Sequence, residues 1–596
     1  MKSLRYINSL MREFFSRWGS YLLLVELVAA ATAGVAVPLM RWATAGILRQ
    51  AGIPYLGVDN FTFVLLHHPG ATALLLMLLV LLLVLVYLQF AVLLGGIASI
   101  QQREGLGVRG IVREGLADLR HLRPSSFGFF VIYLLLIVPF AGVVVQSALL
   151  NKVKIPAFVL DWLGTKPLFA ILVAVFYGAA AYLGLRWVRV LPNTILRDQP
   201  LLTAARQSWH QTRGKFWRYS WRLLLLTVGA TLVGWVWSSG LIGLQTLLDR
   251  TAIAFPAAVV LLTLLLAGQT LLGGASSVLY LLFLVAPDEL RPAIRPIPNK
   301  HHWLRRIIVL VSGGAVVVIM AAFGAFYMTG ALAEHPLTIS HRGVDAGNGV
   351  QNTIPALRKT AAERPDFVEM DLHETKDGQF IVLHDENLKA LAGINRTPHQ
   401  LTLAQLKQIT VRENGHAAKL ASFDDYLTAA ERLNQKLIVE LKPAPGDSPQ
   451  MLDHFISRYA KRLVADHDRI HSLSYKLMTE LHQRVPKLYA GFIMPFSLVA
   501  PQTDLSGYTV EETTLDSELV DTVHAQHQSV WAWTVNDPDT MAQMLFEDVD
   551  GIITDNLSEL KQVIAEQSNH PSYAQRLRLF ATTLDDFGDP VIGNSY

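Results

Sequence analysis

Hydrophobic and polar positions divide the chain into two unlike parts. The first 330 residues contain long uncharged runs, whereas residues 335–596 mix short apolar runs with stretches rich in His, Asp, Glu and Lys. A helix needs about 20 apolar residues to cross a bilayer. We therefore predict about seven transmembrane helices, near residues 20–43, 71–99, 126–150, 166–188, 221–246, 256–285 and 306–330. Together they form an N-terminal all-α polytopic membrane domain over residues 1–333.

The second part has the pattern of strands that lead into polar segments. Strand-forming runs at 337–340, 366–368, 380–383 and 437–439 each precede a short motif that contains histidine or acidic residues. Side chains at the C-terminal ends of strands are where a (β/α)8 barrel builds its active site. We predict such an α/β domain over residues 334–570. Residues 571–596 lack strong periodicity and are predicted to form a loosely packed C-terminal tail.

Composition and charge give this division an orientation. Of the 596 residues 52% are hydrophobic, which is too apolar for a soluble protein. Lys and Arg cluster in the N-terminal segment and in alternate loops, near 103–123, 186–218 and 291–306. Basic short loops stay on the cytoplasmic side. We predict a multi-pass protein of the cell membrane with a cytoplasmic N-terminus, and an odd number of spans then places the C-terminal domain outside the cytoplasm.

The same charge distribution limits the partners. The net charge of +3 is concentrated in the loops of the apolar half, where membrane topology and contact with anionic lipids account for it. We therefore predict membrane lipids as partners and no nucleic acid, while the sequence names no protein partner. The chain contains no cysteine, which fits an extracytoplasmic domain without disulfides but is also common in the cytosol.

Three carboxylates of the second part are candidates for a metal site. Glu369 and Asp371 are two residues apart on a predicted strand, so both side chains point to the same side. Glu440 ends another predicted strand. Like charges held this close tend to bind a cation or share a proton, and an all-oxygen set suits Ca²⁺ or Mg²⁺ better than Zn²⁺. Any one of them could belong to a salt-bridged strand rim, but three at strand ends favour a divalent metal.

Two histidines and two cations complete the candidate chemistry. His341 and His384 titrate near neutral pH and could act as general acid and base on opposite sides of a phosphorus atom. Arg342 and Lys442 could hold phosphate oxygens, Arg as a fork and Lys as a point charge. A structural histidine or a surface ion pair is the alternative for each of these residues taken alone.

These phrases resemble, in order, the motifs of the glycerophosphodiester phosphodiesterases. The pattern of that family runs HRG, P-E-N-T, E-x-D with T-K-D-G, H-D, a glutamate with a lysine, W-T-V-N and D-G-I-I-T-D. The chain has His341-Arg342-Gly343, Gln351-Asn352-Thr353, Glu369-Met370-Asp371, Thr375-Lys376-Asp377-Gly378, His384-Asp385, Glu440-Leu441-Lys442, Trp533-Thr534-Val535-Asn536 and Asp550-Gly551-Ile552-Ile553-Thr554-Asp555. The likeness covers residues 337–560, and the apolar half looks like the multi-span domain that precedes the barrel in some members.

The resemblance implies a TIM-type barrel that hydrolyses glycerophosphodiesters to glycerol 3-phosphate and an alcohol with a divalent metal. It implies Glu369, Asp371 and Glu440 as metal ligands, His341 and His384 as the acid and base, and Arg342 and Lys442 as phosphate contacts. It leaves open whether water or the glycerol hydroxyl of the substrate attacks first.

One departure from the family pattern lies beside these residues. The glutamate of P-E-N-T is Gln351 here, a neutral amide that accepts a hydrogen bond but brings no charge. Gln351, Asn352 and Trp533 are predicted to support or line the site.

Two alternatives remain from the sequence. A membrane half that presents lipid would suit a phospholipase, or a phosphodiesterase acting on a glycerophosphate polymer. In the second alternative the membrane half is a transporter or lipid-binding module, and a catalytically weakened barrel serves as its receptor. Gln351 is the feature that favours the second alternative, whereas the intact histidines and carboxylates favour an enzyme.

Overall fold

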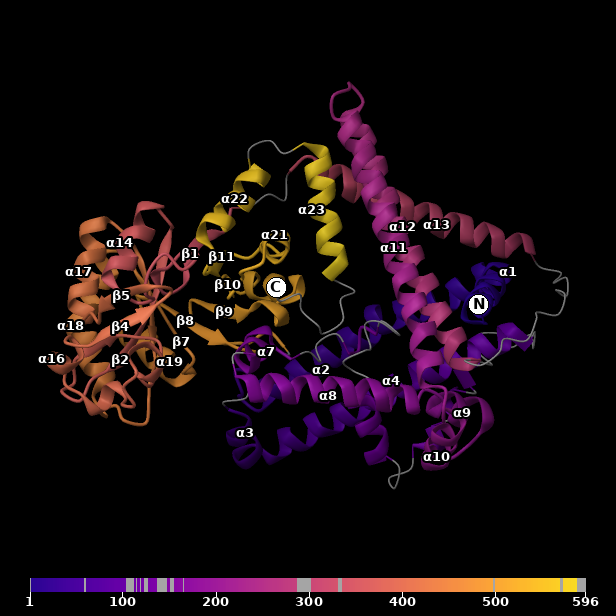
Figure 1. Ribbon diagram of the computed structural model, residues 1–596, viewed down its shortest axis with the longest axis horizontal. Helices are drawn as coiled ribbons and strands as arrows, with labels where there is room; N and C mark the ends of the chain where they lie inside the picture. The colour runs from indigo at the N-terminus through magenta and orange to yellow at the C-terminus, as the bar shows by residue number, and fades with distance from the viewer. Residues whose placement is uncertain are drawn as a thin grey trace. The chain divides into compact units, whose positions relative to one another are not determined.

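The computed structural model of the protein describes residues 2–586, apart from 58–59, 103–111, 114, 118, 123–126, 137–146, 151–154, 165, 287–301, 331–334, 497–498 and 569–571 (Figure 1). The chain forms two compact units. One contains Met1–Ala51, Val64–Ala331 and Ser572–Tyr596, and the other contains Gly52–Phe63 and Leu332–Pro571. The predicted boundaries at 333/334 and 570/571 fall on residues outside the described part, as do most of the basic loops 103–123 and 291–306.

The first unit is helical. Its helices are α1 (Lys2–Ala31), the π-helical turn η1 (Thr32–Ala36), α2 (Val37–Gln50), α4 (Pro69–Gln102), η2 (Leu119–His121), α7 (Ala157–Gly164), α8 (Pro167–Arg186), α9 (Val190–Arg197), α10 (Leu201–Gln211), α11 (Phe216–Leu248), α12 (Ala254–Val285), α13 (His302–Met328) and α23 (Tyr573–Asp586), while α3 (Phe61–His67) crosses between the units. Helix α4 is apolar on every face, which is the composition expected of a membrane span.

Five helical segments of the described residues are long and apolar enough to cross a membrane. They are Ser3–Gln50, Pro69–Gln101, Pro167–Arg197, Phe216–Leu248 and Ala254–Val285. They contain the predicted spans 20–43, 71–99, 221–246 and 256–285, and all but the first residue of the span 166–188. The remaining predicted spans, 126–150 and 306–330, coincide with shorter apolar helices at Phe127–Leu136 and Gly313–Met328. The first of these continues into residues outside the described part, so the number of seven crossings stays a prediction.

The second unit is a closed parallel barrel. Its eight parallel strands are β1 (Leu337–Ser340), β2 (Phe367–Glu374), β6 (Leu437–Leu441), β7 (Arg469–Ser472), β8 (Tyr489–Met494), β9 (Gly507–Glu511), β10 (Ser529–Trp533) and β11 (Gly551–Thr554). Strand β1 pairs with both β11 and β2, which closes the sheet. The covering helices are α14 (Ile354–Ala362), α17 (Phe423–Leu433), α18 (Met451–Ala465), α19 (Tyr475–Arg484), α20 (Ser517–His524), α21 (Pro538–Phe546) and α22 (Leu557–Ser568) (Figure 1). The predicted fold class is confirmed.

Alternation along the strands separates two apolar layers. Val368, Met370 and Leu372 of β2 belong to the large core between the sheet and the helices. Ile339, Phe367, Ile438, Trp531 and Ile553 form a separate cluster. Because neighbouring residues of a strand point to opposite faces, Glu369 and Asp371 are directed away from the layer that holds Met370.

The run at 380–383 is not a barrel strand. Its residues Phe380–Val382 form β3, which pairs antiparallel with the C-terminal half of β2. Further excursions before α17 are α15 (Lys389–Ala392), η4 (Pro398–Gln400), α16 (Leu403–Leu406) and the hairpin of β4 (Thr410–Glu413) with β5 (His416–Lys419). The chain therefore runs back along β2 as β3 before it continues to β6. His384 follows β3 and lies at the cavity near the C-terminal ends of the barrel strands.

A segment from the N-terminal half belongs to the barrel unit. No helix lies between β8 and β9 in the described part of residues 495–506. Tyr55, only 7% exposed, is part of the barrel's large core and packs its ring on Tyr475 and Phe492 at centroid distances of 5.0 and 4.7 Å. The backbone N–H of Gln502 also donates to the carbonyl of Pro54 at 2.8 Å. Residues 52–57 thus cover this side of the barrel.

The described part of the predicted C-terminal tail, residues 572–586, contains a helix with packing partners. Helix α23 belongs to the helical unit, where Phe580 contacts Tyr327 and the backbone N–H of Ala574 donates to Asp249 at 3.0 Å. Leu577 is fully buried. The apolar positions that anchor α23 span only two turns, which is too short a period to identify in a sequence without its packing partners.

Candidate active site

A cavity of about 90 Å³ opens among residues near the C-terminal ends of the barrel strands. Its lining comprises His341, Arg342, Glu369, His384, Glu440, Lys442, His471, Leu473, Ile493, Thr509, Trp533 and Ile553. Seven of these were candidates from the sequence, including both histidines, both cations and Trp533. The structure therefore brings together residues that lie up to 212 positions apart in the chain.

Three buried carboxylates come from two neighbouring strands. Glu369 and Asp371 stand on β2, and Asp371 is in register with Glu440 on β6. Their exposed fractions are 3%, 1% and 9%. The two acids of β2 lie inside that strand and not at its end, because β2 continues to Glu374 to pair with β3.

The buried cations balance part of this negative charge. Nζ of Lys442 lies 3.0 Å from Oδ1 of Asp371 and 3.4 Å from Oε2 of Glu440. Burial favours the neutral form of each group, yet Lys442 and its neighbours hold the pKa of Asp371 well below its usual value, and Asp371 in turn raises the pKa of Lys442. Burial and the adjacent carboxylates raise the pKa of Glu440 to about 8. Without a further cation, Glu440 is the member of the three carboxyl groups that keeps its proton.

His341 is held by an acid that directly follows the last strand. It begins the short 3₁₀ turn η3 (His341–Gly343) directly after β1, and its Nδ1 lies 2.8 Å from Oδ1 of Asp555. Asn536 donates to the other oxygen of Asp555 at 2.8 Å. Burial opposes the charge of Asp555, but His341 and Asn536 lower the pKa of this acid. The turn requires Gly343, since its φ is +68° and an added Cβ would lie 2.8 Å from the Tyr426 hydroxyl.

His384 is braced in the same way by its sequence neighbour. Its Nδ1 lies 2.8 Å from Oδ1 of Asp385, and its backbone carbonyl lies 3.1 Å from Nε2 of His373. Burial lowers the pKa of His384, so the neutral imidazole predominates at neutral pH. The hydrogen bond from His384 lowers the pKa of Asp385, which keeps that acid ionised.

Gln351 and Asn352 support the site from the loop after η3. The Asn352 amide donates to Asp371 at 2.7 Å, and the backbone N–H of Asp371 donates to Asn352 at 3.1 Å. Gln351 accepts from Nη1 of Arg342 at 2.8 Å and donates to Glu413 at 2.6 Å. Both residues therefore orient the charged groups and do not line the cavity.

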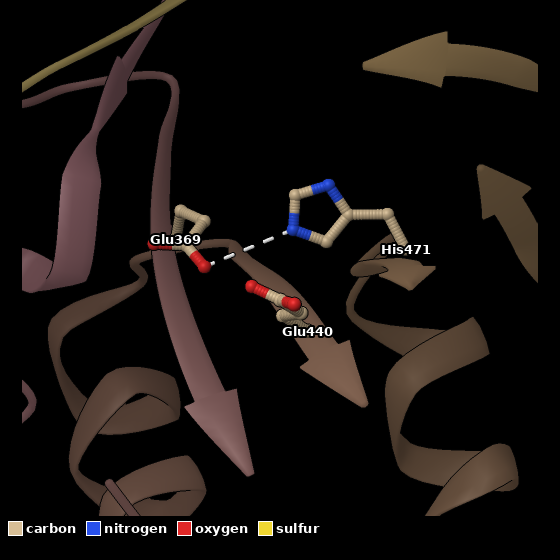
Figure 2. A group of neighbouring side chains, drawn as sticks. All are labelled: Glu369, Glu440 and His471. Atoms are coloured by element: carbon tan, nitrogen blue, oxygen red, sulfur yellow. Dashed lines mark ion pairs between the residues drawn. The ribbon is translucent and has the colours of Figure 1, made fainter. Parts of the chain in front are cut away.

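His471 is a site residue that the sequence did not reveal. It stands on β7, is 2% exposed, and directs Nε2 toward Glu369 at 3.7 Å (Figure 2). Ligand atoms of Glu369, Glu440 and His471 all lie within 4.8 Å of one another, so this group could hold a metal ion. A lone histidine in the four-residue strand Arg469–Ser472 gives no signal without the register that places it beside Glu440. Thr509, Leu473, Ile493 and Ile553 were likewise not predicted.

The donor set fits a divalent metal. Glu440, raised in pKa by burial beside two other carboxylates, is a group that a cation would deprotonate and stabilise. Glu369 is fixed from behind, because Oε2 accepts the backbone N–H of Arg342 at 2.9 Å while Oε1 faces His471. These residues present ligand atoms to one shared volume.

Comparisons with known proteins identify the family of this chain. A family model described as the membrane domain of glycerophosphoryl diester phosphodiesterase matches residues 7–323, and one for the glycerophosphoryl diester phosphodiesterase family matches residues 341–559. Glycerophosphodiester phosphodiesterase GDPD4 of Arabidopsis thaliana is 25% identical over 38% of this chain and 72% of its own length. A glycerophosphodiester phosphodiesterase of Caldanaerobacter subterraneus subsp. tengcongensis is 24% identical over 38% of this chain and 97% of its own length.

A shorter likeness is to a human protein named lysophospholipase D GDPD1, which is 43% identical over 13% of this chain and 23% of its own length. The two family models together account for the helical unit and the barrel. The chain therefore belongs to the glycerophosphoryl diester phosphodiesterases that carry a membrane domain before the catalytic barrel, and it is a phosphoric diester hydrolase of that family.

Proposed function

We propose that this protein is a membrane-anchored, metal-dependent enzyme that hydrolyses glycerophosphodiesters to glycerol 3-phosphate and an alcohol. The observation that carries the proposal is the pair of histidines at one cavity, each with Nδ1 2.8 Å from a carboxylate. A carboxylate at Nδ1 fixes the ring and its tautomer, so Nε2 is the atom that exchanges a proton with substrate.

The residues then have separate tasks. Arg342 and Lys442 hold the phosphoryl oxygens. One histidine removes a proton from the attacking oxygen, which belongs to water or to the glycerol hydroxyl of the substrate, as the new P–O bond forms. The other donates a proton to the departing alkoxide as its P–O bond breaks. Attack by the glycerol hydroxyl gives a cyclic phosphate, which water then opens to glycerol 3-phosphate. Glu369, Asp371 and Glu440 would hold the divalent ion, Ca²⁺ or Mg²⁺ on the oxygen donors alone, and the ion would offset charge on the phosphoryl oxygens.

The test uses the full-length protein in detergent with glycerophosphocholine and glycerophosphoglycerol. Release of glycerol 3-phosphate should require a divalent metal and stop with EDTA. His341→Ala and His384→Ala should each lower kcat by about 10²-fold to 10⁴-fold, whereas His416→Ala, at an exposed strand position, should not. A folded protein that releases no glycerol 3-phosphate with any divalent metal would contradict the proposal and favour the receptor alternative.

A second substrate class has support from the cavity wall. Leu473, 44% exposed, joins Ile493 and Ile553 in the lining and gives the cavity an apolar side. An acyl chain of a lysophospholipid would bury against such a side more favourably than a choline headgroup. Measuring kcat/KM for lysophosphatidylcholine and glycerophosphocholine with one preparation decides between the two classes. A preference for the lysolipid that Leu473→Ser abolishes would identify a lysophospholipase D.

We further propose that the barrel lies outside the cytoplasm. The segment Gly52–Phe63 directly follows the first long apolar helix, Ser3–Gln50, and belongs to the barrel unit. If that helix crosses the membrane once, the barrel must lie on the side opposite to the N-terminus. The basic N-terminal segment favours the cytoplasm for the N-terminus.

A further inference from the structure

A buried histidine nitrogen in the cavity lacks a hydrogen-bond partner. His471 is 2% exposed, and its Nε2 makes no hydrogen bond among the described residues. Leaving a buried polar atom unpaired costs about 1 to 3 kcal/mol, so such an atom in a native site calls for a ligand or a functional role. The two histidines assigned to proton transfer do not account for it.

The surroundings of His471 allow the ring tautomer that a metal ligand needs. Nδ1 lies 3.1 Å from the Thr509 hydroxyl oxygen, which can accept the ring proton. Nε2 then presents a lone pair toward Oε1 of Glu369 at 3.7 Å. Two electron-rich atoms face each other at a distance too long for a hydrogen bond. A histidine that binds a metal through one ring nitrogen usually donates the N–H of its other ring nitrogen to an acceptor.

The separation suits a shared ion. Two ligand atoms that are each about 2.1 Å from one metal lie about 3.0 to 4.2 Å apart, depending on the angle between them. The 3.7 Å distance falls within this range. Glu440 lies on the adjacent strand with its carboxylate directed at the same volume, and the three ligand atoms are within 4.8 Å of one another (Figure 2). Rotation about the broad terminal torsion of a glutamate closes the remaining distance.

We propose that Nε2 of His471 binds the catalytic metal together with Glu369 and Glu440. The centre then has a nitrogen ligand among its oxygens. Imidazole favours first-row transition ions over Ca²⁺, which takes oxygen ligands, and over Mg²⁺. The inference rests on the metal dependence proposed above and refines it, because the preferred ion becomes Mn²⁺, Co²⁺ or Zn²⁺.

The test reads the ligand directly and does not depend on turnover. Full-length protein is stripped with EDTA, dialysed and loaded with one equivalent of Mn²⁺, and pulsed electron paramagnetic resonance records nitrogen coupling to the ion. Wild-type protein should show coupling to one imidazole nitrogen, which His471→Gln should lose. His416→Gln, the matched control on the exposed hairpin strand β5, should keep it.

Binding titrations add a second readout. His471→Gln should weaken Mn²⁺ binding about 10-fold to 100-fold and change Ca²⁺ binding far less, since Ca²⁺ gains little from an imidazole. Bound Mn²⁺ without nitrogen coupling in the wild-type protein would overturn the inference, even if His471→Gln fails to fold. If the wild-type protein shows no nitrogen coupling but still hydrolyses substrate, the inference about His471 fails and the proposed function stands. If it shows nitrogen coupling but no hydrolysis, the proposed function fails and His471 remains a metal ligand.

Discussion

At the scale of single residues, the replaced family glutamate has a structural counterpart. Gln351 donates to Glu413 through both its side chain, at 2.6 Å, and its backbone N–H, at 2.9 Å. On its other side it accepts from Arg342 at 2.8 Å. Glu413 of the β4–β5 hairpin therefore supplies the carboxylate that position 351 lacks, and the Gln351 side chain lies between it and Arg342. The Gln351 amide links Arg342 to this carboxylate by hydrogen bonds.

Restoring the family residue should consequently do harm. In Gln351→Glu two carboxylates would meet at 2.6 Å, and the free energy of unfolding of the barrel should fall by about 1 to 2 kcal/mol. The double variant Gln351→Glu with Glu413→Gln reverses the donor and acceptor and should recover most of this loss. Urea titration followed by hydrogen exchange of barrel peptides measures both variants. Equal stability of Gln351→Glu and wild type would contradict the account.

Asp555 is predicted to position His341 and not to touch substrate. Asp555→Asn should lower kcat about 10-fold to 10³-fold because the amide favours the wrong tautomer of the ring. KM should stay within about 3-fold, since substrate contacts are unchanged, and the melting temperature should shift little. A matching rise in KM or a cooperative loss of stability would show that Asp555 has a structural role only.

At the scale of elements, strand runs could be read from the sequence but their partners could not. The runs that begin at Leu337 and Leu437 became barrel strands, whereas the equally strand-like run Phe380–Val382 pairs antiparallel with β2. All three runs consist largely of strand-forming residues, so local composition does not distinguish them. Which strand each one pairs with depends on contacts between segments that are distant in the sequence. His471 escaped prediction for the same reason, because only the register of β7 against β6 places it beside Glu440.

Residues 52–57 are an element that no local pattern could assign. We predict that Tyr55→Ala destabilises the barrel by about 3 kcal/mol, because it removes a large aromatic side chain from a packed core. Hydrogen exchange of barrel peptides in the full-length protein measures this loss. Phe61→Ala is the matched control, since Phe61 lies in the longer segment Gly52–Phe63 of the barrel unit but is 54% exposed. Similar effects of the two substitutions would argue against a specific role of Tyr55.

Asp468, which directly precedes β7, gives the stability of the barrel a pH dependence. Asp468 accepts the backbone N–H of Leu437 at 2.7 Å, and burial raises the pKa of Asp468 to about 7. The unfolded pKa is about 3.9, so the native barrel binds the extra proton between these values and loses stability as the pH rises through this window.

Asp468→Asn keeps the acceptor and removes the titration. The variant should be more stable than wild type by about 2 kcal/mol near pH 8, and the difference should shrink toward pH 4. Unfolding midpoints of barrel peptides, measured by hydrogen exchange across this range, test the prediction. A difference between the variant and wild type that does not change with pH would contradict it.

At the scale of the whole molecule, the division into a helical part and a barrel followed from hydrophobic patterning, since long apolar runs and strand periodicity are both local signals. The exchange of segments between the units did not. Gly52–Phe63 joins the barrel unit, and Ser572–Tyr596 returns to the helical unit, so each unit contains a piece that is distant in sequence. Such exchanges depend on side-chain packing, as shown by Tyr55 and Leu577, each of which is buried in a short apolar run that does not indicate its partner.

The exchanged segment makes the membrane topology testable with a chain that has no cysteine of its own. A single cysteine at Lys487, exposed on the barrel, should react with an impermeant maleimide in intact cells. Cysteines at Asn8 or Arg213, exposed positions of the N-terminal segment and of a basic loop, should react only after the membrane is opened. Because residues 52–63 tie the barrel to the loop that follows the first helix, the barrel and this loop cannot lie on different sides. Protection of Lys487→Cys together with labelling of Asn8→Cys would invert the whole arrangement, whereas labelling of both in intact cells would show that the helix Ser3–Gln50 does not cross the membrane.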